Sequence, residues 1–337
     1  MKALVYTAPH KIELQTYPDP KPRADEVVVR VRASGVCGSD ILGFLGKSKK
    51  RVPPLILGHE MAGEVTAVGG DVEDLAAGAR VTIMPLSTCG ACVHCKRGRN
   101  SVCEKRVLLG LHVAGGFAEY AVVPRSGVYE LPREMDWLKA SMVEPLATPT
   151  NLFLNHVRDR IASATIFGAG TQGLLALQLA RLRGAGQIFV VDVQDARLAV
   201  AERLGARAIH ARKVDPAAAI LEATGGQGCD VVVDTAGLSG TRQQGLKVVA
   251  RAGVLAFVGL SDPATELDVV DIINREIEIH GVYGYNPRDF ERALSIIIHK
   301  DVDVTSWVRE FPLDDGPRVF EQLTSNPGDL VKASLTP

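Results

Sequence analysis

The stretch ATIFGAGTQGLLALQLARL, residues 164–182, decides the fold. A short apolar run ends at a glycine-rich turn, and an apolar run of helical character begins directly after the turn. The turn fits the pattern G-x-G-x-x-G, in which the first glycine permits the tight bend and the second lets the backbone approach a pyrophosphate. The third glycine lets helix and strand pack closely, so the stretch predicts a dinucleotide-binding unit. The cofactor-binding residues expected in this turn are Gly168, Gly170, Thr171, Gln172 and Gly173.

A second apolar strand, residues 187–192, ends on Asp192, nineteen residues after Gly173. A carboxylate at this position can bind the ribose hydroxyls of the adenosine half. It would also repel a 2′-phosphate, so Asp192 predicts NAD rather than NADP. Arg197 lies five residues further and could reach the adenine side, although a solvated position on a helix explains it equally well.

Further apolar strands alternate with helical stretches, at residues 206–210, 229–234, 253–260 and 277–284. Continuous apolar strands separated by helices indicate an α/β fold with a doubly wound parallel sheet. The loops Thr235–Leu238 and Val258–Leu260 follow strand ends, where such a sheet binds its ligand. Val258 and Gly259 are therefore further cofactor-binding candidates.

The first 140 residues or so have a different pattern, with short β-like runs broken by many glycines and prolines. This pattern is typical of an irregular, mostly β domain with long loops. We expect a first domain at residues 1–146 and the dinucleotide-binding domain at residues 147–284. The last segment, residues 285–337, is expected to return to the first domain.

The composition excludes several classes of protein. The chain has 337 residues, 46% of them apolar, and a formal net charge of −1. The near-balanced charge argues against nucleic-acid binding and against a disordered acidic tail. We expect no signal peptide and no membrane span, because the N-terminal stretch lacks an apolar run and the longest apolar stretch is interrupted by glycines and charge. A cytoplasmic location is therefore expected.

Four cysteines lie close together in CGACVHCKRGRNSVC, residues 89–103. With no secretion signal, clustered cysteines indicate a metal site before disulfides. Four thiolates at this spacing can close a tetrahedral zinc site without water, which is a structural site. The expected ligands are Cys89, Cys92, Cys95 and Cys103. A zinc module that binds nucleic acid or a protein partner is the rival interpretation, which the neutral charge and the dinucleotide turn disfavour.

Two further segments, GVCGSD and GHEMAG, carry residues that suit a second metal. Three protein ligands and one open position make a catalytic zinc site. Cys37 and His59 could supply two ligands, and the third could be Glu60 or Glu144. Asp40 could accept the other ring N–H of His59 and so fix its tautomer. From the residues alone, nothing shows that these segments meet.

The motifs GVCGSD, GHEMAG, the four-cysteine segment, GGFAEY, VEPLA and GAGTQG occur in this order, and together they resemble the zinc-dependent medium-chain dehydrogenase/reductase family. The chain is most similar to the polyol and secondary-alcohol branch, which includes sorbitol, galactitol-phosphate, threonine and butanediol dehydrogenases. The resemblance covers essentially the whole chain. It implies a GroES-like catalytic domain, a Rossmann domain, catalytic zinc on Cys37 and His59, and a homo-oligomer, either a dimer or a tetramer. The family's third ligand is a cysteine in alcohol dehydrogenases; Glu144 stands at that position here, and Glu60 is the other candidate.

The resemblance also implies a reaction, in which hydride passes between a secondary alcohol or polyol and NAD. An amino-alcohol such as threonine or an aminocyclitol is the alternative substrate. Ser39 follows Cys37 by two residues, where the family carries a proton-relay hydroxyl, but Leu42 stands where alcohol dehydrogenases often have a relay histidine. Proton exit could instead involve water and Glu60 or Glu144. The basic run Lys47–Arg51 could attract an acidic or phosphorylated substrate, although a solvated loop is the more ordinary interpretation.

Overall fold

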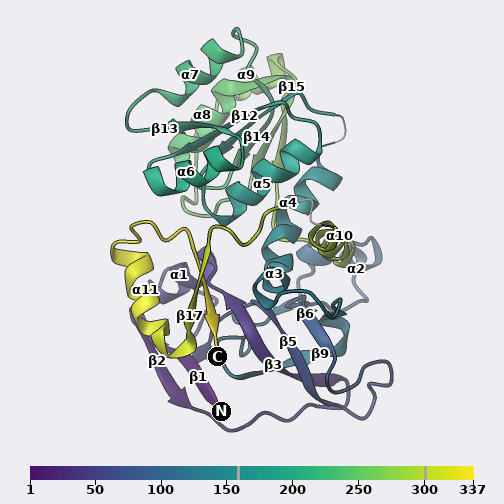
Figure 1. The fold of residues 1–337 in the computed structure, drawn as a ribbon. Helices are drawn as coiled ribbons and strands as arrows, with labels where there is room; N and C mark the ends of the chain where they lie inside the picture. The colour runs from purple at the N-terminus through teal and green to yellow at the C-terminus, as the bar shows by residue number, and fades with distance from the viewer. Residues whose placement is uncertain (158–159, 300–301) are drawn as a thin grey trace. The chain divides into compact units, whose positions relative to one another are not determined.

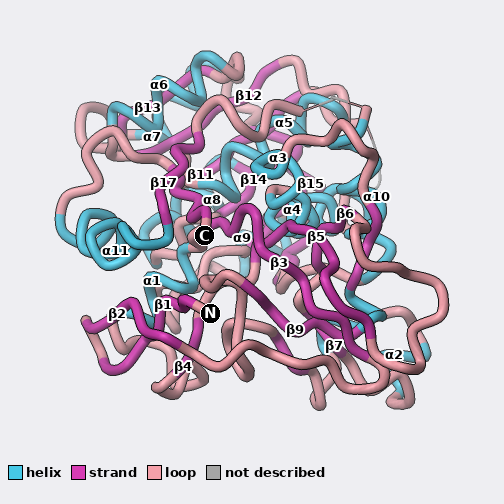
Figure 2. The backbone as a smooth tube through the Cα atoms, turned by 60° about the horizontal axis from the view of Figure 1, so that its bottom comes forward, coloured by secondary structure: helices cyan, strands magenta, loops and turns pink. Residues whose placement is uncertain are grey.

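The computed structural model describes residues 1–157, 160–299 and 302–337, and the chain forms two compact units. One unit comprises Met1–Pro145 together with stretches that begin at Asn286 and Val304. The other comprises Leu146–Tyr285 and a short stretch that ends at Asp303. The C-terminal residues thus belong to the unit that the first part of the chain builds, and Figures 1 and 2 show both chain ends near one another on it.

The first unit is built mainly from β-strands. Its largest sheet has the order β10-β6-β5-β3-β18-β17, with β9 also paired to β3. The strands are β10 (Val128–Glu130), β6 (Arg80–Ile83), β5 (Glu60–Val68), β3 (Glu26–Gly35), β18 (Lys332–Thr336), β17 (Val308–Pro312) and β9 (Tyr120–Pro124). A smaller sheet pairs β2 (Lys11–Thr16), β1 (Lys2–Ala8) and β4 (Leu55–Ile56), and β7 (Leu86–Ser87) pairs with β8 (Val107–Leu108).

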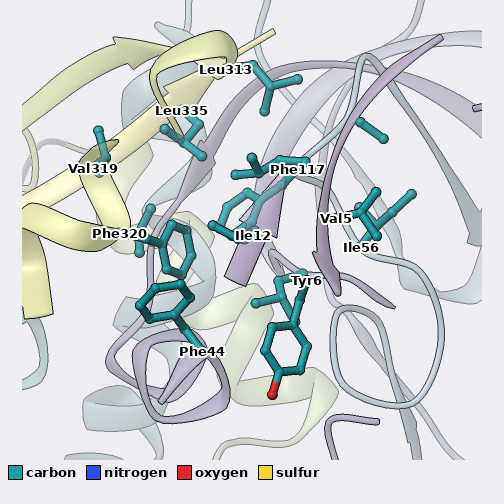
Figure 3. Packing of buried hydrophobic residues seen from close by; sticks show 14 of the residues in the cluster. Val5, Tyr6, Ile12, Phe44, Ile56, Phe117, Leu313, Val319, Phe320 and Leu335 are labelled. Atoms are coloured by element: carbon teal, nitrogen blue, oxygen red, sulfur yellow. The ribbon is translucent and has the colours of Figure 1, made fainter. Parts of the chain in front are cut away.

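Short helices complete this unit. They are α1 (Gly38–Phe44), α2 (Val93–Lys96), α3 (Trp137–Ser141), α10 (Pro287–Ile298) and α11 (Gly316–Ser325), and α4 (Val143–Asn155) begins beside the end of α3. An aromatic core joins α1 and the smaller sheet to α11 (Figure 3). In it Phe320 of α11 packs against Phe44 and Phe117, with ring centroids 5.4 and 5.9 Å apart. The C-terminal helix is therefore part of the core that supports α1.

Strand register brings three segments of the first unit together. β3 pairs antiparallel with β5, which places Gly35 opposite Glu60. β3 also pairs antiparallel with β18, which places Gly35 opposite Ser334. The chain turns from the end of β3 into α1 at Cys37, so the motifs GVCGSD and GHEMAG lie side by side. The last strand of the chain borders the same position.

The second unit is a six-stranded parallel sheet with the order β13-β12-β11-β14-β15-β16. Its strands are β11 (Ser163–Phe167), β12 (Gln187–Asp192), β13 (Arg207–His210), β14 (Cys229–Asp234), β15 (Val249–Phe257) and β16 (Glu278–Gly281). The helices α5 (Thr171–Leu182), α6 (Asp195–Arg203), α7 (Pro216–Ala223), α8 (Ser239–Val248) and α9 (Val269–Asn274) alternate with these strands along the chain (Figure 1). In strand numbers of this sheet the order is 3-2-1-4-5-6, that of the Rossmann fold, so the predicted doubly wound parallel sheet is confirmed.

One strand is displaced from its predicted position. The expected strand at residues 253–260 is β15, which begins at Val249 and ends at Phe257. The next two backbone N–H groups, of Val258 and Gly259, both donate to the carbonyl of Asp234, at 2.9 and 3.0 Å. These residues therefore leave the strand ladder and form a loop. Among the helices of the described residues, none is long and apolar enough to cross a bilayer.

Candidate metal centres and cofactor loop

The four clustered cysteines meet in space. Cys92 lies at the N-terminus of α2, where its sulfur accepts the backbone N–H of Cys95 at 3.5 Å. The sulfur of Cys89 accepts the N–H of Cys92 at 3.4 Å. Backbone donors from Ala91 and Cys92 lower the pKa of Cys89 to about 6. This thiol therefore ionises readily at neutral pH, and the thiolate is the form that binds metal.

The sulfur–sulfur distances fit a tetrahedral ion. Neighbouring sulfurs of Cys89, Cys92, Cys95 and Cys103 lie 3.5, 3.6, 3.9 and 3.9 Å apart. A Zn–S bond of about 2.3 Å implies tetrahedral edges of roughly 3.8 Å. All four cysteines are free thiols, and they form one of the groups that could hold a metal ion. The donor set and its spacing suit zinc, as the sequence indicates.

A second group of candidate ligands is formed by Cys37, His59 and Glu60, whose donor atoms all lie within 4.8 Å of one another. Cys37 caps the N-terminus of α1, Glu60 is the first residue of β5, and His59 directly precedes that strand. His59 and Glu60 are buried, while Cys37 is half-buried and reachable. Thiolate, imidazole and carboxylate are all zinc ligands. This arrangement suits a metal ion that is covered by protein on the side of His59 and Glu60 and is accessible to solvent on the side of Cys37.

Asp40 lies beside the imidazole of His59. Its carboxylate is fully buried, and its Oδ1 lies 3.4 Å from Nδ1 of His59. The remaining ring nitrogen, Nε2, is therefore the one left for a metal. Oδ2 of Asp40 accepts the backbone N–H of Cys37 at 3.1 Å. Burial opposes ionisation of Asp40, but the charges of a protonated His59 and of Arg51 outweigh it and hold the pKa at about 2.

Glu60 also has a cationic partner. Its carboxylate forms a buried ion pair with the ammonium of Lys332, which donates to the carbonyl of Val36 at 3.0 Å as well. A side chain at residue 35 would place its Cβ 2.1 Å from Oε2 of Glu60, so the glycine there makes room for the pair. Since a carboxylate has two oxygens, one can face Lys332 while the other faces a metal.

The remaining predicted site residues of this unit have different positions. Ser39 lies on α1 two residues after the capping Cys37, and its backbone N–H donates to that sulfur at 3.5 Å. Leu42 lies on the same helix and offers no polar group. Glu144 is buried in the first turn of α4. Among the described residues, the ligand group that contains Cys37 and His59 includes Glu60 and does not include Glu144.

The glycine-rich turn has the geometry that a dinucleotide requires. Gly168 adopts φ +98°, in the left-handed region, and a Cβ on Gly173 would lie 1.8 Å from the carbonyl oxygen of Gly168. Both positions therefore need glycine. Gly170, at the N-terminus of α5, faces open space, and no side chain caps the helix. Thr171 and Gln172 form its first turn, whose N–H groups suit a phosphate.

Asp192 ends β12 beside this turn. Its carboxylate accepts the N–H of Ala169 at 2.7 Å, and those of Val193 and Gln194 at 2.7 and 3.0 Å. Arg197 on α6 lies 3.9 Å away from it. Val258 and Gly259 occupy the loop after β15, and Gly259 packs closely against Gly237 in the loop after β14. The predicted cofactor residues thus follow strand ends of one sheet.

Comparison with known proteins identifies both parts of the chain. Residues 23–133 match the alcohol dehydrogenase GroES-like domain, and residues 173–299 match the zinc-binding dehydrogenase domain. The chain is 33% identical to an L-threonine 3-dehydrogenase of Bacillus velezensis, over 96% of this chain and 95% of the relative. It is 32% identical to a sorbitol dehydrogenase of Bacillus subtilis, over 100% of this chain and 97% of the relative. The chain belongs to the zinc-containing medium-chain alcohol dehydrogenase family.

Solved structures of similar proteins bind either dinucleotide. A protein described as a zinc-binding dehydrogenase from Sinorhizobium meliloti 1021, bound to NADP, is 32% identical with a TM-score of 0.92, over 100% and 99% of the two chains. A short chain alcohol dehydrogenase from Escherichia coli CFT073, complexed with NADH, is 26% identical with a TM-score of 0.93, over 100% and 99% of the two chains. The matched domains make this chain a zinc-type dehydrogenase of the alcohol and polyol family.

Two residues of this dehydrogenase were not recognised from sequence. Lys332 is the first residue of a mostly buried C-terminal strand, and only the strand pairing shows that it reaches Glu60. Arg51 belongs to the basic run that was interpreted as a solvated loop. That interpretation holds for Lys47, Lys49 and Lys50, which are exposed, but is wrong for Arg51, which is buried. Arg51 is drawn inward because Asp40 and Ser39 accept its hydrogen bonds.

Proposed function

We propose that this dehydrogenase oxidises a secondary alcohol or polyol with NAD as the hydride acceptor, through a catalytic zinc on Cys37, His59 and Glu60. The observation that carries the proposal is the convergence of these three donors beside the half-buried hydroxyl of Ser39. Zinc, when bound, supplies a Lewis acid that makes a nearby alcohol more acidic, and NAD accepts the hydride. A second zinc on the four cysteines has a structural role.

The residues of the chain have separate tasks in this scheme. Asp40 holds the imidazole of His59 in one tautomer through its buried carboxylate. Ser39 accepts the proton of the alcohol and passes its own proton on. Glu144 remains the alternative third ligand, and its place at the start of α4 also suits a contact with water. The ligand spacing favours Glu60 over Glu144.

The choice of NAD over NADP rests on Asp192. Its carboxylate lies at the end of β12, where three backbone N–H groups hold it in one orientation. An ionised carboxylate there accepts hydrogen bonds from ribose hydroxyls and repels a 2′-phosphate. Arg197, 3.9 Å away, is already attracted to Asp192 and so offers less to a phosphate.

An amino-alcohol is the second candidate substrate. It is favoured by the relative named L-threonine 3-dehydrogenase, which matches this chain about as well as the relative named sorbitol dehydrogenase. The exposed lysines near residue 50 give a further variant, a phosphorylated or acidic polyol. These substrates differ in charge at a position away from the reacting carbon. Comparing the rate on a plain polyol with the rates on its amino and phosphorylated counterparts therefore identifies the substrate class.

Initial rates of NADH formation test the proposal. The panel contains sorbitol, galactitol and their phosphates, butanediol, threonine and an aminocyclitol, each with NAD⁺ and with NADP⁺. Turnover of one polyol or secondary alcohol with NAD⁺ is the expected result. A preference for threonine or the aminocyclitol replaces the polyol with the amino-alcohol. A protein that holds two zinc ions per chain and turns over none of these alcohols contradicts the proposal.

A further inference from the structure

Arg51 is a buried cation beside the candidate zinc site. Its side chain is 4% exposed, and its Nη2 lies 3.0 Å from Oγ of Ser39 and 3.0 Å from Oδ1 of Asp40. It thus contacts the residue expected to relay the proton and the residue that orients His59. Its Nε is buried and has no hydrogen-bond partner among the described residues. Burying a guanidinium is costly, so these contacts need an explanation.

The helix next to Arg51 is shaped to receive it. A side chain at residue 43 would place its Cβ 2.3 Å from Cδ of Arg51, so the stem of Arg51 occupies the space that a glycine leaves on α1. The side chain of Leu42, the preceding residue, has no group that could hydrogen-bond to Ser39. The polar neighbour of Ser39 on this side is therefore Arg51, which comes from the loop after α1 rather than from the helix itself.

The hydrogen bond from Arg51 restricts how Ser39 can use its hydroxyl. A guanidinium donates hydrogen bonds, accepts none and keeps its charge at any physiological pH. A serine hydroxyl has one hydrogen and two lone pairs. Because Nη2 donates to Oγ, it occupies one lone pair and turns the hydroxyl hydrogen away from Arg51. One lone pair and the O–H bond remain for other partners on the accessible side of Ser39.

We propose that Arg51 is a positioning residue for proton transfer through Ser39. The inference rests on the proposed dehydrogenase function. In the oxidation direction the alcohol's O–H bond breaks and its proton bonds to the free lone pair of Ser39 Oγ. The Ser39 O–H bond breaks at the same time and its proton passes to water, while the electron pair stays on the alcohol oxygen. The fixed positive charge of Arg51 orients Ser39 and stabilises the partial negative charge that Oγ carries as its own proton leaves for water.

The rival explanation is that Arg51 only neutralises the buried carboxylate of Asp40. In that case, removing Arg51 disturbs His59 and the metal whether or not Ser39 is present. A double-mutant cycle separates the two explanations, because the effects of substitutions at two residues that act through one another do not add. The variants are Arg51→Met, Ser39→Ala and the combination of both.

We expect Arg51→Met to lower kcat by roughly 10- to 100-fold with the KM of the alcohol nearly unchanged. In the Ser39→Ala background the same change should lower kcat by less than about twofold. Zinc should remain at two ions per chain, and the solvent deuterium isotope effect on kcat should rise. The matched control is Arg125→Met, which removes an arginine paired with Asp74 in the same unit and should leave kcat unchanged. Equal losses of kcat in both backgrounds, with zinc retained, would overturn the proposal.

A second variant and a second measurement test the proposal if Arg51→Met releases zinc. If Arg51→Met releases zinc, the cycle is repeated with Arg51→Lys, which keeps the charge. Release of zinc by Arg51→Lys as well would overturn the proposal, since Arg51 would then be a structural support of the ligands. The same double-mutant cycle can be measured without substrate, from the urea concentration at the midpoint of unfolding. Arg51→Met should lower this midpoint less in the Ser39→Ala variant than in the wild type. Absence of turnover in the wild type would instead refute the proposed function.

Discussion

The ammonium of Lys332 and the carboxylate of Glu60 form a buried ion pair although 272 positions separate them in the chain. Both side chains are 1% exposed. The pair forms because β3 lies between β5 and β18, so the first residues of these two strands meet beside Gly35. The same carboxylate belongs to the candidate zinc ligands. The C-terminal strand therefore supplies a charge that balances one ligand of the site.

Replacing Lys332 by methionine should destabilise the protein strongly, because it leaves Glu60 buried without its cation. We expect a loss of about 3 kcal/mol or more in the free energy of unfolding when a chelator is present. The loss should be smaller with zinc bound, since the ion replaces part of the missing charge. Urea unfolding with and without chelator measures both values. Lys2→Met breaks an exposed ion pair with Asp314 and should cost less than about 1 kcal/mol.

Zinc content distinguishes the two candidate third ligands. Glu60→Gln should reduce zinc from two ions per chain to about one, because the four cysteines keep theirs. Glu144→Gln should retain both ions, because its carboxylate is not among the converging donors of the described residues. Both glutamates are buried, so each variant serves as the control for the other. Elemental analysis after gel filtration gives the ratio, and loss of zinc in Glu144→Gln alone would reverse the assignment.

The four-cysteine segment should depend on its metal for order. Cys103 is fully buried, and its replacement by serine should release one zinc ion per chain and expose residues 89–103 to proteolysis. The physical reason is that this segment contains only short helical turns around the sulfurs. Cys229→Ser is the matched control, because that buried thiol contacts Thr165 and lies in a strand of the other unit. Intact zinc content in Cys103→Ser would refute a structural site.

Replacing Asp192 by asparagine should weaken selection for NAD. The negative charge that repels a 2′-phosphate disappears, and the new amide nitrogen cannot accept the hydrogen bond from the N–H of Ala169. We expect kcat/KM for NAD⁺ to fall at least about tenfold while that for NADP⁺ rises or stays level. Asp195→Asn, an exposed change on the following helix, should alter neither value. An unchanged ratio of the two cofactors would remove Asp192 as the selector.

Ionisation of Asp234 should make the free energy of unfolding depend on pH. This carboxylate ends β14, accepts the N–H of Gly237 and the hydroxyl of Thr241, and is fully buried. Burial raises its pKa above the usual 3.8, despite these hydrogen bonds and the nearby Arg242. The folded state therefore binds this proton more tightly than the unfolded state does. Its contribution to stability falls as pH rises from 3.8 to the raised folded-state pKa, and is constant beyond it.

Unfolding measured at closely spaced pH values tests this sign. The unfolding free energy of the wild type minus that of Asp234→Asn should decrease through the window, by at most about 1.4 kcal/mol per pH unit. Asp74→Asn is the contrasting variant, because hydrogen bonds from Arg125 lower the pKa of Asp74. The unfolding free energy of the wild type minus that of Asp74→Asn should increase as pH rises toward 3.8. A flat difference for Asp234→Asn would contradict the raised pKa.

Much of the second unit could be predicted from sequence because its signals are local. The strands ending at Asp192 and Asp234 lie where the apolar runs place them, and the turn at Gly168 has its glycines where backbone geometry requires them. The end of β15 was misplaced, because the loop at Val258 is apolar like the strand. That end is set by two hydrogen bonds that the backbone N–H groups of Val258 and Gly259 donate to the carbonyl of Asp234 in the neighbouring strand β14.

The candidate zinc site could be predicted only in part because its partners are distant in the chain. The motifs containing Cys37 and His59 indicate the metal, and Asp40 lies beside His59 as the sequence suggested. Lys332 and Arg51 could not be placed in this way. A lysine or arginine in a sequence is ordinarily exposed, and only the pairing of β3 with β18 or the space at Gly43 shows that these two are not.

The space that Gly43 leaves for Arg51 has an evolutionary consequence. If a larger residue replaces Gly43 while Arg51 is present, its Cβ lies 2.3 Å from Cδ of Arg51, which is a steric clash. If a shorter residue replaces Arg51 first, this clash does not arise. The two positions should therefore change in a fixed order, with Arg51 lost before Gly43 is filled. Homologues with a larger residue at position 43 should lack the arginine, and reconstructed ancestors that carry the arginine should carry the glycine too.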